Sequence, residues 1–326
     1  SRFNLVLLLA RMPSQSKNNI IEVTDLRKRY QKATTDSVKG ISFYVEEGSF
    51  FSLLGPNGAG KTTTISILTT ILSATSGSVT IAGHSVEQEP AAVRQEIGVI
   101  FQNPSLDLNL TAEENIRFHA NLYNLYPYRP TFGSMAKGYR DKVSELAEVL
   151  GLEKDLYKPV KSLSGGMKRK LEIIRSLMHQ PRVLFLDEPT TGLDPVSRKN
   201  LWNYLQQIRK QQDITIFLTT HYLEEADGSD FICIIDEGMI VAKGSPTEIK
   251  KALIQHYILV DAKDKPKLIK EFSSHKLEFE GSGPFKVNLG KKSAQEVIQM
   301  IRTPLTSIDI LMPSLEDAYV EIVNKD

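Results

Sequence analysis

The chain has 326 residues, of which 41% are hydrophobic and 24% are charged, with 40 Lys and Arg against 39 Asp and Glu. This composition is too apolar for a disordered chain, and a mean hydropathy of −0.21 is too polar for a protein mostly embedded in a membrane. The net charge of +1 gives no basic field for wholesale binding of nucleic acid. The length predicts about two domains, and the single cysteine, Cys233, fits a reducing, cytoplasmic compartment.

The N-terminal residues differ in pattern from the rest of the chain. The apolar run Leu5–Ala10 is much shorter than the roughly 20 residues of a spanning helix, and no small-residue cleavage site follows it. The sequence also opens on Ser1 rather than on methionine. We therefore expect residues 1–19 to be a leader, disordered or non-native up to Met12.

Short strands are expected from Ile20 onward. Residues 21–23 and 41–45 alternate, which predicts a sheet with one wet face, whereas the continuous apolar run 50–54 is typical of a strand buried on both faces. A helix over 61–72, a hairpin-like pair around 78–81 and a buried strand at 99–101 are predicted next.

Residues 111–180 read as mostly helical, with a loop over 126–140, where prolines, glycines and tyrosines accumulate. Val143, Leu146, Ala147 and Leu150 mark one apolar helix face. Further strands at 183–186 and 214–218 enclose a helical pattern at 201–208. Strands that alternate with helices predict a parallel sheet wrapped by helices.

After about Lys250 the pattern predicts a small α+β appendage without a catalytic motif. Its expected elements are a strand at 257–260, a helix at 265–272, a hairpin over 275–289, a helix at 293–302 and a strand at 308–311. Ser314, just after Pro313 and three residues before Asp317, predicts a capping-box-like start of a closing helix. The apolar face of that helix would be Leu315, Ala318, Tyr319 and Ile322.

The sharpest motif is GPNGAGKT, which matches G-x-x-x-x-G-K-[ST] between a predicted buried strand and a predicted helix. Its glycines let several N–H groups point into one concavity, and the helix N-terminus adds its dipole, so the loop can cradle phosphates. Lys61 should reach the β and γ phosphates, and the Thr62 hydroxyl should hold Mg²⁺. The predicted nucleotide-binding residues of this loop are Gly55, Pro56, Asn57, Gly58, Ala59, Gly60, Lys61, Thr62 and Thr63.

Polar residues follow three other predicted strands. Asp187 and Glu188 end the strand at 183–186, and we assign Asp187 to Mg²⁺ and Glu188 to the attacking water. Gln102 and His221 end two further strands. His221 alone would more often be structural, but ligands bind outside the carboxyl ends of parallel strands, so these residues are expected to converge on one site.

A second anion-binding segment is expected at Leu163, Ser164, Gly165, Gly166 and Met167, just before a predicted helix. Ser-Gly-Gly is a good N-cap, and exposed N–H groups at a positive helix end also bind anions. This segment lies away from the predicted sheet edge. We therefore expect it to serve the nucleotide of a neighbouring subunit.

These motifs together resemble the ATP-binding subunits of ABC transporters, over about Ile20 to Lys250. GPNGAGKT is similar to the Walker A motif of that family, VLFLDEP to Walker B and LSGGM to the signature sequence. Gln102 resembles the Q-loop, Asp194 the D-loop and His221 the switch histidine. Tyr30 matches the aromatic residue that stacks on adenine, although a tyrosine after basic residues also fits surface packing.

The resemblance implies an α/β P-loop NTPase cassette at 20–250, with a mostly parallel core sheet, an antiparallel β subdomain and a helical subdomain at about 103–180. Residues 251–326 would form the small C-terminal α+β domain. It also implies ATP and Mg²⁺ as cofactors, with catalytic roles for Glu188, His221, Gln102 and Lys61. Thr62, Gln102 and Asp187 would hold the metal.

The Thr-Thr-Gly-Leu-Asp-Pro wording and the terminal segment 313–319 resemble the drug-resistance (daunorubicin-resistance-like) branch, which drives ABC-2-type exporters. The family's mechanism implies a head-to-tail homodimer at the cytoplasmic face of the membrane, whose closure and ATP hydrolysis drive a separate permease chain. One alternative is a soluble ATP-gated clamp on ribosomes or nucleic acid, against which the neutral charge argues. Another is a catalytically dead regulatory cassette, against which Glu188 and His221 argue.

Overall fold

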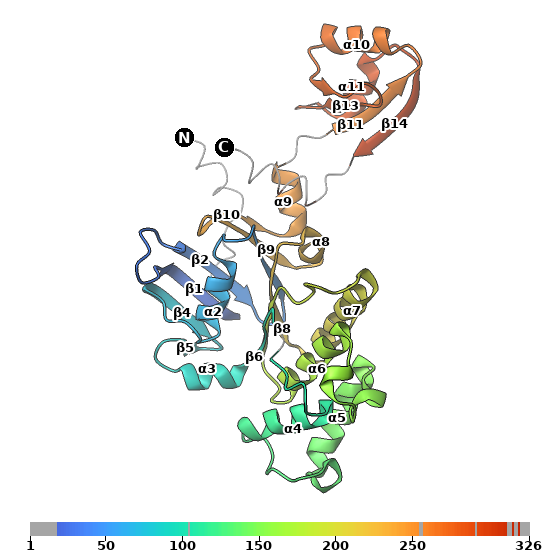
Figure 1. Ribbon diagram of the computed structural model, residues 1–326. Coiled ribbons are helices and arrows are strands. Elements are labelled where there is room, and N and C mark those ends of the chain that lie inside the picture. Colours follow the sequence, from blue (N-terminus) through green and yellow to red (C-terminus); the bar gives the residue numbers. More distant parts are fainter. Residues whose placement is uncertain are drawn as a thin grey trace. The chain divides into compact units, whose positions relative to one another are not determined.

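The structure of the chain is a computed structural model that describes residues 18–253 except 104, residues 257–311 except 291, and residues 315 and 319. The chain divides into two compact units, Ser1–Ser245 and Pro246–Asp326 (Figure 1). Residues 1–17 of the predicted leader, Met12 included, lie outside the described residues. Among the residues that are described, no helix is both long and apolar enough to cross a membrane.

A four-stranded antiparallel sheet of order β2-β1-β4-β5 forms one wall of the first unit (Figure 1). Its strands are β1 (Asn19–Lys28), β2 (Val38–Glu46), β4 (Ser76–Ile81) and β5 (His84–Ser85). Alternate residues of β1 and β2 are buried against the core, as the alternating sequence pattern predicts. The hairpin predicted around 78–81 is confirmed as the pairing of β4 with β5.

The central sheet has six strands in the order β10-β9-β3-β8-β7-β6. Neighbours from β9 to β6 are parallel, and only β10 runs antiparallel to its neighbour β9. The strands are β3 (Phe50–Leu54), β6 (Ile97–Ile100), β7 (Val183–Asp187), β8 (Thr215–Thr220), β9 (Phe231–Asp236) and β10 (Met239–Gly244). Every residue of β3, β7 and β8 is buried, which confirms the continuous apolar runs as strands covered on both faces.

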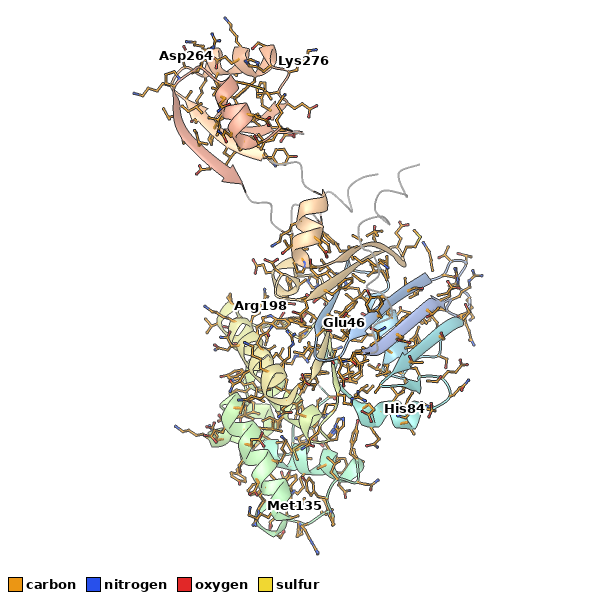
Figure 2. All side chains as sticks on the ribbon, turned by 180° about the vertical axis from the view of Figure 1, so that it is seen from behind. Glu46, His84, Met135, Arg198, Asp264 and Lys276 are labelled. Carbon is orange, nitrogen blue, oxygen red and sulfur yellow. The ribbon has the colours of Figure 1, made fainter. Side chains whose placement is uncertain are left out.

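Helices cover this sheet and form a separate helical part of the first unit (Figure 1). Around the sheet lie α2 (Lys61–Leu68), α3 (Pro90–Glu96), α7 (Pro195–Gln212) and α8 (Leu223–Ala226). The helical part contains α4 (Ala112–Leu122), α5 (Lys137–Leu150) and α6 (Gly165–Leu177), with short 3₁₀ turns at Phe132–Ser134, Glu153–Asp155 and Val160–Ser162. Met135, labelled in Figure 2, is buried in the hydrophobic cluster of this part. The predicted α/β class is confirmed.

Two predicted boundaries are wrong. The helix expected over 61–72 ends at Leu68, because Thr70 has a φ of 63°, which no helix continues. The loop expected over 126–140 ends earlier, since α5 begins at Lys137 and Tyr139 is fully buried in its first turns. The glycine at 138 favoured a loop in the sequence, but burial of the tyrosine beside it outweighs that local preference.

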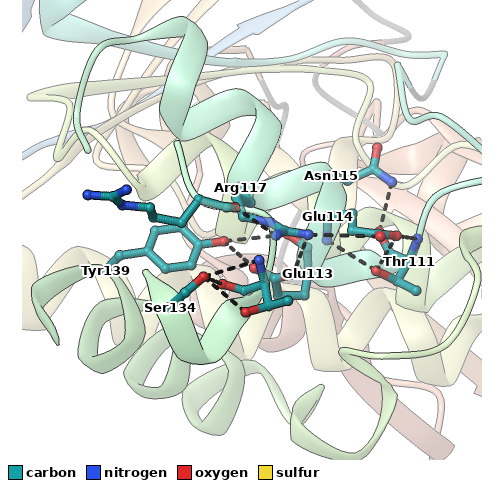
Figure 3. Close-up of polar contacts among 9 residues, drawn as sticks. Thr111, Glu113, Glu114, Asn115, Arg117, Ser134 and Tyr139 are labelled. Carbon is teal, nitrogen blue, oxygen red and sulfur yellow. Dashed lines mark hydrogen bonds and ion pairs between the residues drawn. The ribbon is translucent and has the colours of Figure 1, made fainter. Parts of the chain in front are cut away.

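A buried polar network joins α4 to the connection that follows it and to the first turn of α5 (Figure 3). The Tyr139 hydroxyl donates to Glu113 Oε1 at 2.9 Å, and Arg117 Nη2 lies 3.3 Å from Glu113 Oε2. Arg117 also donates to the Arg129 carbonyl at 2.9 Å. Burial raises the pKa of the Glu113 carboxyl, and the Tyr139 hydrogen bond opposes that shift. The guanidinium and the phenol thus compensate a buried carboxylate that would otherwise destabilise the subdomain.

Tyr139→Phe should lower the free energy of unfolding by about 1–3 kcal/mol at pH 7, because it leaves a buried carboxylate short of a donor. The lost hydrogen bond favours the charged carboxylate, so the deficit should shrink as the pH falls and Glu113 takes up a proton. Urea denaturation at several pH values measures this. The exposed Tyr157 supplies a matched Tyr157→Phe control, and equal losses from both variants would contradict the assignment.

The second unit is built from helices and an antiparallel sheet of order β12-β13-β11-β14. Its elements are α9 (Pro246–Leu253), β11 (Tyr257–Ala262), α10 (Lys265–Ser274), β12 (Phe279–Glu280), β13 (Phe285–Asn288), α11 (Ala294–Met300) and β14 (Leu305–Leu311). From β11 onward this is the β-α-β-β-α-β arrangement of a split βαβ fold. The predicted strands, helices and hairpin of this region are confirmed. Of the closing helix only residues 315 and 319 are described, so Ser314, Asp317, Ala318 and Ile322 lie outside the described residues.

Candidate active site

Two glycines of the loop between β3 and α2 leave no room for a side chain. Gly60 caps α2 with a φ of 107°, and a Cβ there would lie 2.7 Å from the Ser37 carbonyl oxygen. A Cβ on Gly55 would lie 2.2 Å from the carbonyl oxygen of Ile235 on the neighbouring strand β9. The chain therefore turns tightly at the strand end and presents the N-terminus of α2 to the site.

Lys61 is the first residue of α2, and its side chain is 4% exposed. Its Nζ donates to the carbonyl oxygens of Gly55 and Pro56 at 2.7 and 3.0 Å, and it lies 3.6 Å from Glu188 Oε1. Burial lowers the pKa of the Lys61 ammonium, against the attraction of the neighbouring Glu188 carboxylate. A buried ammonium at the N-terminus of a helix is suited to hold an anionic ligand.

Two carboxylates stand at the end of β7. Asp187 is buried, and its carboxylate accepts a hydrogen bond from the Thr219 hydroxyl on β8. Burial raises the pKa of Asp187, while that hydrogen bond lowers it. Glu188 leaves the strand with a φ of 45°, and its N–H donates to the Thr219 carbonyl at 3.0 Å. A non-glycine residue rarely adopts this left-handed conformation.

The Glu188 carboxylate is the meeting point of the predicted strand-end residues. Gln102 Nε2 and the Thr191 hydroxyl both donate to its Oε2 at 3.4 Å. His221 Nδ1 lies 3.2 Å from its Oε1, although out of line for a hydrogen bond. Four segments far apart in the sequence thus supply one cation, one carboxylate, one amide and one imidazole to the same place.

These groups line an open pocket of about 500 Å³, large enough for a nucleotide. The lining residues are Ser37, Asn57, Gly58, Gly60, Lys61, Thr62, Thr63, Gln102, Glu188, Thr191, His221 and Tyr222. Tyr30, predicted to stack on adenine, is not among them. Tyr30 is exposed, with its hydroxyl 3.2 Å from Thr63 Oγ1 at the rim of the loop.

The LSGGM segment lies at a different place. Ser164 is the N-cap of α6, as predicted, and its hydroxyl accepts from the Met167 N–H at 3.2 Å. Ser164, Gly166 and Met167 line a second, smaller pocket with Leu193 and Ser197, and none of these residues lines the pocket of Lys61. Asp194, the predicted D-loop residue, caps α7 by accepting from the N–H groups of Val196 and Ser197 at 3.0 Å. The Ser197 hydroxyl, and after it the backbone N–H groups, hold the pKa of Asp194 below its ordinary value.

One residue that the sequence analysis missed is Arg169 of α6, which is almost fully buried. Its guanidinium donates to the carbonyl oxygens of Phe101 at 2.6 Å and Pro189 at 2.7 Å, and to Glu172 Oε2 at 2.8 Å. It therefore joins the signature helix to the segments that carry Gln102 and Glu188. Phe101 and Pro189 are 68 and 20 residues away from Arg169 in the sequence, and no local sequence pattern predicts such contacts.

Comparisons with known proteins agree with this geometry. The family described as ABC transporter matches residues 38–191. The linearmycin resistance ATP-binding protein LnrL of Bacillus subtilis is 38% identical over 71% of this chain and 70% of that protein. The doxorubicin resistance ATP-binding protein DrrA of Mycobacterium tuberculosis is 41% identical over 71% of this chain and 67% of that protein.

Among solved structures, cbiO1 of Clostridium perfringens, part of the ABC transporter complex cbiONQ, is similar to the chain with a TM-score of 0.63. The two are 28% identical, and the match covers 72% of this chain and 91% of cbiO1. The identities of 38% and 41% to LnrL and DrrA show membership of the family as well as a shared fold. The chain belongs to the ATP-binding proteins of ABC transporters, and it is an ATPase.

Proposed function

We propose that the pocket around Lys61 binds MgATP, with each site residue in a separate role. Lys61 and the N–H groups at the start of α2 hold the phosphates, and Tyr30 contributes to the adenine side. The exposed Thr62 hydroxyl and the Asp187 carboxylate suit Mg²⁺, which takes oxygen ligands from one or two side chains and from substrate phosphates. Gln102 is the third proposed metal contact. When bound, Mg²⁺ would neutralise charge on the phosphate oxygens.

Glu188 is proposed as the base of hydrolysis. Its carboxylate faces the pocket between Lys61 and His221, so it can orient a water molecule and accept its proton as the water attacks the γ-phosphate. His221 Nδ1 lies 3.2 Å from Glu188 Oε1, and His221 is the proposed contact of the γ-phosphate. Gln102 donates to the same carboxylate and so restricts its orientation.

The proposal of a head-to-tail homodimer rests chiefly on one observation, the separation of the two pockets. Ser164 and Gly166 offer a capped helix N-terminus, an anion-binding geometry, yet they line a pocket that shares no residue with that of Lys61. A two-fold dimer would bring this helix end to the nucleotide of the partner and complete two equivalent sites. Closure on ATP and reopening after hydrolysis would then move the attached membrane component.

Complementation in trans tests this arrangement. Lys61→Ala and Ser164→Arg should each abolish hydrolysis in a homodimer. After mixing, each heterodimer keeps one intact site, formed by Lys61 of one chain and Ser164 of the other. An equimolar mixture should therefore recover roughly a quarter of the wild-type rate. A mixture as inactive as its two parents would contradict shared sites.

The separate membrane partner is proposed to be an ABC-2-type permease, with this chain at the cytoplasmic face of the membrane. The drug-resistance names of LnrL and DrrA support an exporter. Phe118 and Leu122, four residues apart on one side of α4, are both more than half exposed and suit an apolar partner surface. Purification from native membranes should recover a polytopic chain with the protein, and that chain's sequence identifies the permease.

The clamp on ribosomes or nucleic acid is not favoured. LnrL and DrrA are named as resistance ATP-binding proteins, and the chain has a net charge of only +1. Recovery of ribosomes or DNA in place of a membrane chain in the same purification would reverse this choice.

A further inference from the structure

A buried carboxylate outside the pocket connects the two segments that carry Glu188 and His221. Glu225 lies on α8 with only 5% of its surface exposed. Its two oxygens accept from two threonine hydroxyls: Thr190 donates to Oε1, and Thr220 donates to Oε2 at 2.6 Å. Both threonines are fully buried. One side chain therefore spans the gap between the end of β7 and the end of β8.

Each threonine lies within two residues of a residue of the proposed hydrolytic site. Thr190 comes two residues after Glu188, and Thr220 immediately precedes His221. The Thr220 hydroxyl also accepts from the Tyr222 N–H at 2.9 Å, so it fixes the backbone on both sides of His221. Tyr222 itself packs against Arg198, which is labelled in Figure 2: the Arg198 guanidinium lies 4.5 Å from the centre of the Tyr222 ring.

The turn at Glu188 needs such support. Parallel pairing of β7 with β8 ends at Asp187 and Thr219, and the next residue has a φ of 45°. A non-glycine residue persists in this conformation only when its surroundings hold it there. The N–H of Glu188 donates to the Thr219 carbonyl on β8. Two residues further along the chain, the Thr190 hydroxyl donates to Glu225 on α8.

We propose that Glu225 is a positioning residue, which sets the distance between the proposed base Glu188 and the proposed γ-phosphate contact His221. This role rests on the proposed function of those two residues. Glu225 does not line the pocket, so it acts through Thr190 and Thr220 rather than on the nucleotide. A carboxylate suits this bridge because each of its oxygens accepts one hydroxyl, whereas a leucine of similar size would leave both hydroxyls without an acceptor.

The full-length protein with Mg²⁺ and ATP provides the test. Glu225→Ala should lower kcat by about 10- to 100-fold, since a displacement of about 1 Å between reacting groups has that effect. The KM for ATP should stay within about twofold of wild type, because the phosphate-binding loop is untouched. The hydrolysis rate of each sample is divided by the amount of a fluorescent ATP analogue that the sample binds. Unfolded protein then does not lower the apparent kcat.

Three variants separate positioning from a general effect on stability. Glu225→Gln can accept from one threonine and donate to the other, so it should restore most of the rate. Glu224→Ala, an exposed neighbour on the same helix, should behave as wild type. In a Glu188→Gln background, Glu225→Ala should cause no further loss. If Glu225→Ala fails to fold, Thr190→Val and Thr220→Val, each removing half of the bridge, provide the same comparison.

Different results would refute the positioning role of Glu225 and the proposed function of the site. A wild-type kcat per bound nucleotide in Glu225→Ala, or an equal fall in Glu224→Ala, would refute the positioning role and leave the proposed function intact. Absence of Mg²⁺-dependent hydrolysis by the wild-type protein, or full activity of Glu188→Gln, would instead refute the proposed function.

Discussion

Glu188→Gln should reduce ATP hydrolysis by about 10²- to 10⁴-fold and leave ATP binding intact. The amide has the shape of the carboxylate but cannot accept a proton from water. The contacts of Glu188 with Gln102 and Thr191 are hydrogen bonds to Oε2, which an amide oxygen can also accept. The phosphate-binding loop and its Lys61 side chain are unchanged in sequence. The variant is therefore expected to retain ATP in a closed dimer.

Size-exclusion chromatography with and without ATP and Mg²⁺ measures the assembly, and phosphate release measures hydrolysis. The variant should elute as a dimer with ATP, whereas the wild type should return to the monomer as ATP is consumed. Glu224→Gln is the matched control, because it makes the same chemical change on an exposed glutamate. A Glu188→Gln protein that stays monomeric with ATP would count against the dimer, and one that hydrolyses normally against the base assignment.

Convergence of the site followed from local sequence patterns. Polar residues placed after buried parallel strands must share one edge of the sheet, and Gln102, Glu188 and His221 do meet around one pocket. The strand before Lys61 and the helix after it could also be predicted, because an unbroken apolar run followed by a glycine-rich turn is typical of a buried strand that leads into a helix. The roles of these residues stay predictions until variants are measured.

What the sequence did not reveal depends on contacts between distant segments. Arg169 binds carbonyl groups at Phe101 and Pro189, and Glu225 binds the hydroxyl of Thr190, 35 residues earlier. Such pairings have no periodicity, since any buried arginine or glutamate on a helix reads as an ordinary polar residue. Tertiary burial likewise decided the start of α5, where Tyr139 enters the core despite a glycine beside it.

Lys61→Ala should weaken ATP binding by about 100-fold or more and thereby abolish hydrolysis. Lys61 is the first residue of α2, and it lines the pocket together with Asn57, Gly58 and Gly60 of the loop. Removing one partner of a buried charge pair, here the proposed pair of Lys61 with a phosphate, costs roughly 2–5 kcal/mol, or about 30- to 5,000-fold in affinity. The contrast with Glu188→Gln is the informative part, because one variant should lose binding and the other only turnover.

Titration with a fluorescent ATP analogue measures the affinity of Lys61→Ala, and thermal melting without nucleotide checks that it is folded. Lys154→Ala, which removes an exposed lysine in the helical part, controls for loss of a positive charge and should bind as wild type does. Burial lowers the pKa of Lys61, so the buried ammonium is disfavoured in the folded protein without nucleotide. A melting temperature close to that of the wild type, combined with lost binding, would show that the lysine serves the ligand rather than the fold. Wild-type affinity in a folded Lys61→Ala protein would refute the phosphate-binding role.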